Sequence, residues 1–240
     1  MARRGTHGGR WFVVTAFLAL LGLLLVYQAW MLGQVVWYAH HDPGESAVMR
    51  QELARLRERN PNTVLQHTWV PYERINASLK RAVVASEDAN FVEHDGVEWD
   101  AMRDAWEYNQ RQEALGRRAR RGGSTITQQL AKNLFLSNSR NYLRKGEELI
   151  LTVMIEQLMS KRRILEIYLN MAEWGTGVFG AQAAARHYYQ VDAAQLDAWQ
   201  AARLAAMLPN PRYYDQHRDT RYLDARAATI GARMRQAVIP

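Results

Sequence analysis

The sequence predicts a mainly α-helical protein, in which one N-terminal transmembrane helix precedes a helical domain. Two observations support this fold class. A strongly apolar, uncharged stretch lies near the N-terminus, and most of the remaining chain carries apolar residues at helical spacing. Hydrophobic residues make up 48% of the 240 residues and charged residues 23%, which excludes a disordered or collagen-like chain.

The apolar stretch runs from Trp11 to Ala39 without a charged residue, and Trp11–Leu32 is apolar almost throughout. A helix of about 20 such residues crosses the roughly 30 Å hydrocarbon core of a bilayer. A cleaved signal peptide would have a shorter apolar core, of about 7–15 residues, that ends at small residues. Gln28–Met31 does not offer such a cleavage site, so residues 11–39 are expected to form an uncleaved signal-anchor.

The charges beside this stretch predict its orientation. Arg3, Arg4 and Arg10 precede it, whereas the next basic residue after it is Arg50. Positive charge is retained on the cytoplasmic side of a membrane. We therefore expect a single-pass protein, with residues 1–10 as a cytoplasmic tail and residues 40–240 on the far side of the membrane.

Beyond the anchor, residues 40–60 read as a linker and residues 61–240 as one domain. Asp42–Gly44 predicts a turn in the linker, and Gln51–Arg59 predicts a short charged helix. A short strand is expected near Val64–Val70. Helical periodicity predicts helices at Ile75–Ser86, Trp99–Leu115, Thr125–Leu136, Arg144–Ser160, Arg162–Met171, Ala181–Tyr189, Ala193–Met207 and Asp219–Val238.

The charge balance is basic: 31 Lys and Arg against 24 Asp and Glu give a net charge of +7 and a pI near 9.8. This balance suits nucleic acid, anionic lipid or a phosphorylated substrate. Cysteine is absent, which excludes disulfides, thiolate nucleophiles and cysteine-based metal sites. The few lysines are Lys80, Lys132, Lys145 and Lys161.

Glu87 is the first candidate catalytic residue. It shares a helix face with Leu79 and Val83, at spacing i, i+4, i+8, so it ends an apolar stripe. Partial burial would raise its pKa toward neutrality, which suits a general acid or base. An isolated glutamate at this place would more often be an ordinary surface residue.

Gly122–Leu136 (GGSTITQQLAKNLFL) is the most informative stretch. Two glycines precede a helix for which Thr125 and Gln128 form a capping-box pattern. Thr125, Gln128 or Gln129 and Lys132 would line one face with donors, and phosphate binds well at such helix N-termini. A plain capped amphipathic helix fits the pattern equally well.

Arg144–Glu148 (RKGEE) places two cations within reach of Glu148 on one helix. Nearby positive charge is expected to keep Glu148 ionised, whereas Glu87 would be protonated more readily. Two carboxylates in different environments can take different roles in one site. A weak surface salt bridge is the competing interpretation. The helix that follows, Leu149–Leu158, is apolar over most of its surface and is expected to be central.

Lys161–Tyr189 is expected to serve the fold. Ile164, Leu165, Tyr168 and Leu169 have core spacing, and Gly175, Gly177 and Gly180 predict a tight irregular turn. Polar groups in so apolar a setting more often satisfy one another than react. A structural role is therefore favoured for Glu166, Tyr168 and Asn170.

Together these stretches resemble the motif series of the peptidoglycan glycosyltransferases of glycosyltransferase family 51. The matching motifs are EDxxFxxHxG at Glu87–Gly96, GGSTITQQLxKN at Gly122–Asn133, RKxxE at Arg144–Glu148, KxxILExYLN at Lys161–Asn170 and, more weakly, Arg226–Met234. The resemblance covers about residues 60–238. No transpeptidase domain follows, which is typical of the monofunctional members. The segment Gln110–Arg121 is longer and more basic than this resemblance implies.

The resemblance implies a lysozyme-like catalytic domain with a small membrane-proximal lobe. It implies an inverting enzyme that polymerises lipid II into β-1,4-linked glycan and releases undecaprenyl diphosphate. Glu87 matches the general base, and Glu148 matches the second acidic residue, at the donor diphosphate. The matched substrate-binding residues are His94, Ser124, Thr125, Gln128, Gln129, Lys132, Arg144 and Lys145.

No cofactor is required by this interpretation. Glu148 beside cations allows either direct stabilisation of the diphosphate by Lys and Arg, or a Mg²⁺ or Mn²⁺ ion there. The expected partners are lipid II, the growing glycan strand, membrane lipids and division or elongation proteins. Nucleic acid is not expected, because the basic residues face the periplasm.

Two other functions stay open. A membrane-anchored, lysozyme-like lytic enzyme would also use a buried glutamate, but it would not need the cations around Glu148. A non-enzymatic scaffold for envelope assembly would explain the anchor and leave the Glu and Lys pattern unexplained.

Trp99, Met102 and Trp106 also form a stripe ahead of the basic run Arg117–Arg121. This stripe predicts either a core helix or a helix that lies on lipid.

Overall fold

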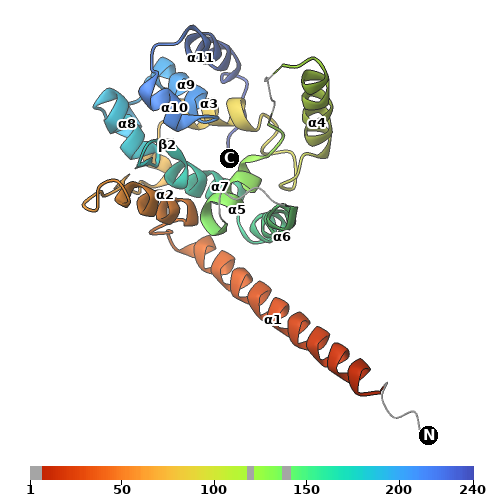
Figure 1. Cartoon of the computed structure of the whole chain (residues 1–240). Helices are drawn as coiled ribbons and strands as arrows, with labels where there is room; N and C mark the ends of the chain where they lie inside the picture. The colour runs from red at the N-terminus through yellow and green to blue at the C-terminus, as the bar shows by residue number, and fades with distance from the viewer. Residues whose placement is uncertain (1–6, 118–121, 137–141) are drawn as a thin grey trace, which may run out of the picture. The chain divides into compact units, whose positions relative to one another are not determined.

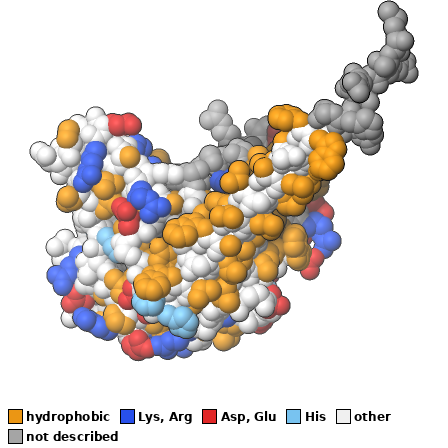
Figure 2. All heavy atoms as spheres, turned by 90° about the horizontal axis from the view of Figure 1, so that it is seen from below, with side chains coloured by type: hydrophobic (Ala, Val, Ile, Leu, Met, Phe, Trp, Pro, Cys, Tyr) orange, Lys and Arg blue, Asp and Glu red, His pale blue; other side chains and the backbone are white. Residues whose placement is uncertain are grey.

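The computed structural model describes residues 7–117, 122–136 and 142–240, and it divides the chain into two units, residues 1–41 and 42–240. The first unit contains α1 (His7–His40), which at 1.5 Å per residue is about 50 Å long. Within it Trp11–His40 is long and apolar enough to cross a membrane, with a mean hydropathy of 2.2. Figure 2 shows its hydrophobic side chains as a band along the helix.

The second unit is mainly helical, which confirms the predicted fold class (Figure 1). In chain order its described elements are α2 (Ala47–Arg57), β1 (Gln66–His67), η1 (Tyr72–Arg74), α3 (Ala77–Glu87), α4 (Trp99–Ala114), α5 (Ile126–Phe135), α6 (Tyr142–Leu158), α7 (Lys161–Met171), β2 (Glu173–Gly175), β3 (Val178–Phe179), α8 (Ala181–Tyr189), η2 (Ala193–Gln195), α9 (Ala198–Met207), α10 (Pro211–Gln216) and α11 (Arg221–Arg233).

Most predicted helices are present, and their bounds differ from the predicted ones by a few residues. The predicted helix Ala193–Met207 is wrong, because it is divided into η2 and α9. Asp197 accepts a hydrogen bond from the backbone N–H of Gln200, and the Gln200 side chain accepts from the N–H of Asp197. This capping box starts a new helix in the middle of the alanine-rich run.

The predicted linker contains a packed helix. α2 begins at Ala47, four residues before the predicted start, because the Ser46 hydroxyl accepts from the N–H of Met49. Val48, Met49 and Glu52 are buried, and α2 packs against α5. α10 was not predicted at all; it is a short helix with Pro211 in its first turn.

The described residues form one three-stranded sheet in the order β1–β3–β2. β1 is the short strand expected near Val64–Val70 and pairs in parallel with β3, whereas β2 pairs with β3 antiparallel. The last two strands occupy the stretch predicted as an irregular turn. At its end Gly180 has φ +83°, and a Cβ there would lie 2.7 Å from the carbonyl oxygen of Asn170. This tight approach explains the glycine.

The core of the second unit lies between its helices. α9 packs against both α3 and α11, and α5 packs against α6 and α7. The largest fully buried side chains include Trp174, Tyr168, Phe91 and Phe179. The alanines of α9 are buried in these contacts, and α11 also packs against α3.

α6 is not the central helix that its composition predicted. Leu151, Thr152 and Ile155 are buried, but Ile150 and Val153 on the opposite face are 45% and 53% exposed. A helix that is apolar all round is usually buried. α6 has the same pattern, but one of its apolar faces is left uncovered. The buried face carries Glu148, so α6 brings this residue to the edge of the core.

Candidate active site

Glu87 is the last residue of α3, and its helix face is buried as predicted. Leu79 and Val83 are fully buried on the same face, and the Glu87 side chain is 11% exposed. Burial raises the pKa of Glu87, which confirms the direction expected from the sequence. Hydrogen bonds from Gln129 and Ser86 and the charge of Arg226 partly oppose this rise.

A chain of hydrogen bonds fixes one side of the Glu87 carboxylate. The Gln129 amide nitrogen donates to Oε2 of Glu87 at 3.0 Å, and the Tyr168 hydroxyl donates to the Gln129 amide oxygen at 3.0 Å. The ionised carboxylate can only accept, so it favours the amide orientation with the NH₂ group toward Glu87, and the Tyr168 hydroxyl donates to the amide oxygen on the other side. Tyr168 is consistent with the structural role favoured from the sequence, because its hydroxyl holds the Gln129 amide that contacts the candidate base.

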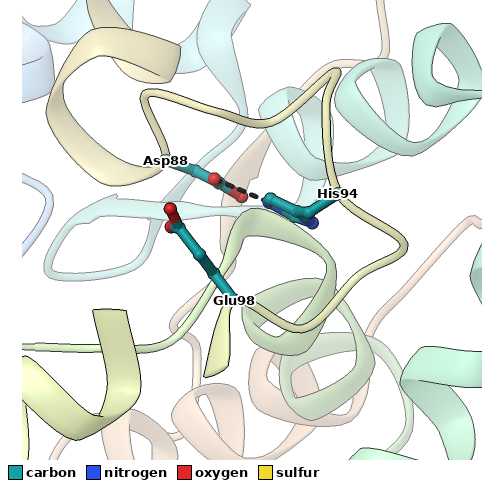
Figure 3. Close-up of side chains that lie close together, drawn as sticks. All are labelled: Asp88, His94 and Glu98. Carbon is teal, nitrogen blue, oxygen red and sulfur yellow. Dashed lines mark hydrogen bonds and ion pairs between the residues drawn. The ribbon is translucent and has the colours of Figure 1, made fainter. Parts of the chain in front are cut away.

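The next residue, Asp88, holds the start of α5. Its Oδ2 accepts from the backbone N–H of Ile126 at 2.9 Å, and its Oδ1 lies 2.8 Å from Nε2 of His94 (Figure 3). Gly96 donates its N–H to Nδ1 of His94, so Nε2 carries the proton and donates to Asp88. A buried carboxylate at a helix N-terminus is favoured by the helix dipole. Asp88 and His94 thus tie the loop after α3 to α5.

Asp88, His94 and Glu98 also form a group whose ligand atoms lie within 4.8 Å of one another. Their bonding does not suit a metal ion. Coordination through Nε2 of His94 would leave a proton on Nδ1, which faces the N–H donor of Gly96. Oε1 of Glu98 already accepts from the Asn90 amide at 2.5 Å. We assign these three residues to the fold of the loop.

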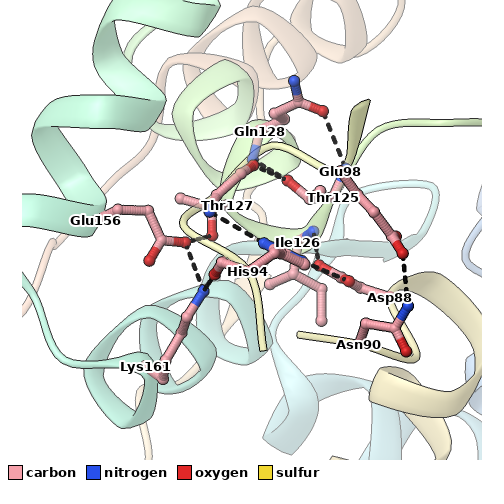
Figure 4. A network of polar contacts seen from close by, with 11 residues as sticks. Asp88, Asn90, His94, Glu98, Thr125, Ile126, Thr127, Gln128, Glu156 and Lys161 are labelled. Atoms are coloured by element: carbon pink, nitrogen blue, oxygen red, sulfur yellow. Dashed lines mark hydrogen bonds and ion pairs between the residues drawn. The ribbon is translucent and has the colours of Figure 1, made fainter. Parts of the chain in front are cut away.

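Thr125 and Gln128 form the predicted capping box at the start of α5. Each side chain accepts from the other residue's backbone N–H, at 3.1 and 3.0 Å, and the Thr125 hydroxyl donates to the carbonyl of Gly96 (Figure 4). Both residues are buried. The cap uses the Thr125 hydroxyl and the Gln128 amide oxygen, and the Gln128 amide nitrogen lies 3.9 Å from Sδ of Met102. A substrate-binding role for these two residues stays a prediction. Ser124, one residue earlier, is exposed.

A second polar network reaches His94 from α6 and α7, and the sequence analysis did not find it. The Lys161 ammonium donates to the His94 carbonyl at 2.6 Å and to Glu156 at 2.9 Å, and the Thr127 hydroxyl donates to the same Glu156 oxygen (Figure 4). Lys161 also lies 4.7 Å from the ring centre of Phe91. The scarcity of lysine was the signal that could have drawn attention to this residue.

Glu148 and the predicted cations form a cluster between α5 and α6. Arg144 donates to Oε2 of Glu148 at 2.6 Å, and Lys145 donates to Oε1. The Glu148 side chain is 4% exposed. Lys132, on α5, lies within electrostatic reach of all three: burial lowers its pKa, Glu148 opposes the decrease, and Arg144 and Lys145 add to it. Arg144 and Lys145 pair with Glu148, and Lys132 lies within electrostatic reach of both Glu148 and Glu173, so cations outnumber carboxylates in this group.

α5 connects this cation cluster to Glu87. Gln129, which contacts Glu87, and Lys132, which faces the cluster, lie three residues apart on adjacent turns of the helix. Three residues advance a helix by about 4.5 Å and keep both side chains on neighbouring faces. α5 therefore contacts Glu87 through Gln129 and reaches the group of cations through Lys132.

Comparisons with known proteins match the chain to one family. The family model described as transglycosylase matches residues 52–235. The chain is 69% identical over 232 residues to the biosynthetic peptidoglycan transglycosylase of Bordetella pertussis, with 96% of each chain covered. It is 70% identical over 223 residues to that of Bordetella avium (93% of each chain) and 54% identical over 230 residues to that of Janthinobacterium sp. (96% of each chain).

Proposed function

The chain belongs to the transglycosylase family, and from this membership we propose that it polymerises lipid II into β-1,4-linked glycan strands of the cell wall. The observation that carries the proposal is that α5 links the two parts: its Gln129 contacts the largely buried Glu87, and its Lys132 lies within electrostatic reach of Arg144 and Lys145. A sugar transfer from a diphosphate donor needs both parts: a base for the attacking hydroxyl and positive charge for the leaving group. The lysozyme-like helical fold expected from the sequence fits this family.

Glu87 is the general base in this mechanism. It removes the proton from the 4-hydroxyl of the acceptor sugar as that oxygen forms a bond to the anomeric carbon of the donor. Its buried position and raised pKa bring its basicity closer to the operating pH than that of a free glutamate. Attack opposite the leaving group inverts the α-linked donor, so the new linkage is β.

The cation cluster acts on the leaving group. As the bond between the anomeric carbon and the diphosphate oxygen breaks, the electron pair stays on the lipid diphosphate, which departs as undecaprenyl diphosphate. Lys132, Arg144 and Lys145 stabilise the developing negative charge. Glu148 holds Arg144 and Lys145 in place between turnovers, since each of its oxygens accepts from one of them.

A divalent metal ion at Glu148 fits this site less well than the cations do. Both carboxylate oxygens accept charged hydrogen bonds, and the surrounding net positive charge would repel Mg²⁺ or Mn²⁺. We therefore propose that Lys and Arg alone neutralise the diphosphate. Polymerisation by protein treated with EDTA and passed through a desalting column should then equal polymerisation with added Mg²⁺; a loss restored by the metal would contradict this.

We also propose the orientation of the protein in the inner membrane. α1 is apolar enough to span, and the arginines of the sequence before Trp11 favour a cytoplasmic N-terminus. The second unit would then lie in the periplasm, where it meets lipid II and the growing strand. Arg3 and Arg4 lie outside the described residues, so the proposal rests on the sequence and on α1.

One experiment tests the function directly. Detergent-solubilised protein is incubated with lipid II and, separately, with finished glycan, and the products are separated by size. Polymer from lipid II supports the transferase. Fragments from finished glycan would instead indicate a lytic enzyme, and the absence of both products would indicate a scaffold. The Glu87→Gln variant serves as the matched inactive control in both incubations.

A further inference from the structure

Arg226 of α11 lies beside Glu87, although the two residues are far apart in the sequence. α11 packs against α9 and α3, and this packing brings the guanidinium to the end of α3. Its Nη2 donates to the Ser86 hydroxyl at 3.1 Å and lies 3.8 Å from Oε1 of Glu87. The Ser86 hydroxyl in turn lies 3.2 Å from the same Glu87 oxygen, so Ser86 bridges the cation and the carboxylate.

We propose that Arg226 is a positioning residue for Glu87, which holds Oε1 through its charge and through Ser86 and keeps the carboxylate ionised and correctly turned for the acceptor hydroxyl. The inference rests on the proposed role of Glu87 as the general base. Arg226 itself need not contact the substrate.

The geometry explains why two contacts are needed. The last side-chain torsion of a glutamate is broad, so a carboxylate held at one oxygen still rotates. Gln129 on α5 holds Oε2, and the pair of Ser86 and Arg226 holds Oε1. Holding a base in its reactive orientation before the substrate arrives lowers the barrier to proton transfer. Each oxygen retains a lone pair for the acceptor hydroxyl.

The charges around Glu87 give this arrangement a measurable consequence. Asp88, which follows Glu87 in the chain, raises the pKa of Glu87, and Arg226 on α11 lowers it. Tyr168 on α7 also faces Glu87, but burial and the charges of Glu87 and Asp88 raise the pKa of its hydroxyl well above the ordinary value, so it stays neutral. Among the residues that the structure describes around Glu87, Arg226 therefore supplies the cation that offsets burial. Removing an opposite charge at about 4–6 Å typically raises a carboxylate pKa by about 1–3 units.

The test is the pH profile of polymerisation by the full-length Arg226→Gln and Arg226→Lys proteins. Glu87 acts as a base when it is ionised, which is above its pKa. Loss of the cation should move the rising limb to higher pH by about one unit, with roughly a tenfold loss of rate below the limb and a near-normal rate above it. Arg226→Lys keeps the charge and should shift the limb less. Lipid II binding should be unchanged in both variants.

Arg221→Gln, at the exposed first turn of the same helix, is the matched control and should leave the profile unchanged. A uniform loss of rate at every pH in Arg226→Gln would overturn the proposal. If that variant does not fold, Ser86→Ala decides, because it removes the hydroxyl that joins Arg226 to Oε1 of Glu87: a limb at the wild-type position in Ser86→Ala overturns the proposal equally. Activity in Glu87→Gln would instead overturn the role of Glu87 as the base, and the absence of polymer from the wild-type protein would overturn the proposed function, so these failures are distinguishable.

Discussion

Gln129 and Glu87 are joined by a hydrogen bond of 3.0 Å from the amide nitrogen to Oε2 of the carboxylate. Because Gln129 belongs to α5, this contact ties the candidate base to the helix that also carries Lys132 toward the cation cluster. One helix thus contacts the base and also carries one of the leaving-group cations. Catalytic groups on such elements keep their geometry better than groups on loops.

The first prediction is that Glu87→Gln abolishes polymerisation and leaves lipid II binding in place. Loss of a positioned general base typically costs about 10²–10⁴-fold in rate. Single-turnover polymerisation and lipid II binding should be measured on the same preparation. Glu93→Gln, at an exposed position in the loop after α3, is the control. Near-normal turnover of a folded Glu87→Gln protein would falsify the assignment.

The second prediction concerns the stability of the same variant. Because burial raises the pKa of Glu87, its protonated form stabilises the folded state, an effect fully present below the unfolded-state pKa and lost as pH rises through the folded-state pKa. At neutral pH the ionised carboxylate therefore destabilises the folded state, whereas an uncharged glutamine does not. Glu87→Gln should have a higher Tm than the wild type at pH 7.5, and this gain should shrink toward pH 4. A lower Tm at pH 7.5 would show that the hydrogen bonds from Gln129 and Ser86 outweigh burial.

The third prediction is that Lys132→Ala and Lys145→Ala reduce turnover by about 10²-fold each, as the loss of one charge-stabilising donor does. Neither change should weaken the fold much. Burial lowers the pKa of Lys132, so the cation is held there at a cost to stability. Diphosphate-containing inhibitors should bind both variants more weakly. The control is Arg81→Ala on the exposed side of α3, and unchanged inhibitor affinity in the two lysine variants would place them outside the diphosphate site.

The fourth prediction concerns Asp88, which accepts hydrogen bonds from both His94 and the N–H of Ile126. Asp88→Asn removes the charge from the N-terminus of α5 and turns an NH₂ group toward one of two donors. The free energy of unfolding should fall by about 1–3 kcal/mol, the usual cost of an unsatisfied buried polar group. Denaturant unfolding measures this change, and Asp95→Asn at an exposed position of the same loop should have no effect. An unchanged midpoint for Asp88→Asn would contradict the structural role of the pair.

Sequence reasoning found the elements and the charges that local spacing determines. The apolar stripe that ends at Glu87 and the i, i+4 pair of Arg144 and Glu148 both depend on residues within one helix turn or two. Arg226 was recognised only as part of a weak motif, because its contact with Glu87 depends on how α11 packs on α9. Spacing likewise could not show that Gln128 is buried in the cap whereas Gln129 contacts Glu87. Consecutive residues of a helix lie about 100° apart, so both fit within one face.

The last prediction concerns α4, whose stripe of Trp99, Met102 and Trp106 had a core helix as its default explanation. The structure favours the alternative. Of the α4 residues that the structure describes, Ala105 is the one that is buried, whereas Trp99 is 67% and Trp106 is 63% exposed. Met102 is half-buried and lies against Gln128. Exposed tryptophans on one helix are typical of a surface that rests in the headgroup layer.

We therefore expect the second unit, prepared without residues 1–41, to bind anionic vesicles and to be released by salt, since each surface cation contributes about 1 kcal/mol of electrostatic attraction. Within the basic run, Arg118, Arg120 and Arg121 lie outside the described residues, so their part rests on the sequence alone.

Co-sedimentation should weaken in Trp106→Ser and when the four arginines of residues 117–121 are neutralised. Tyr222→Ser, an aromatic residue that is 62% exposed on α11, is the matched control. Because Trp106 is exposed, its replacement should leave the Tm within about 1 °C, as most surface substitutions do. If Trp106→Ser unfolds the unit, or if neither change reduces binding, α4 does not face the lipid.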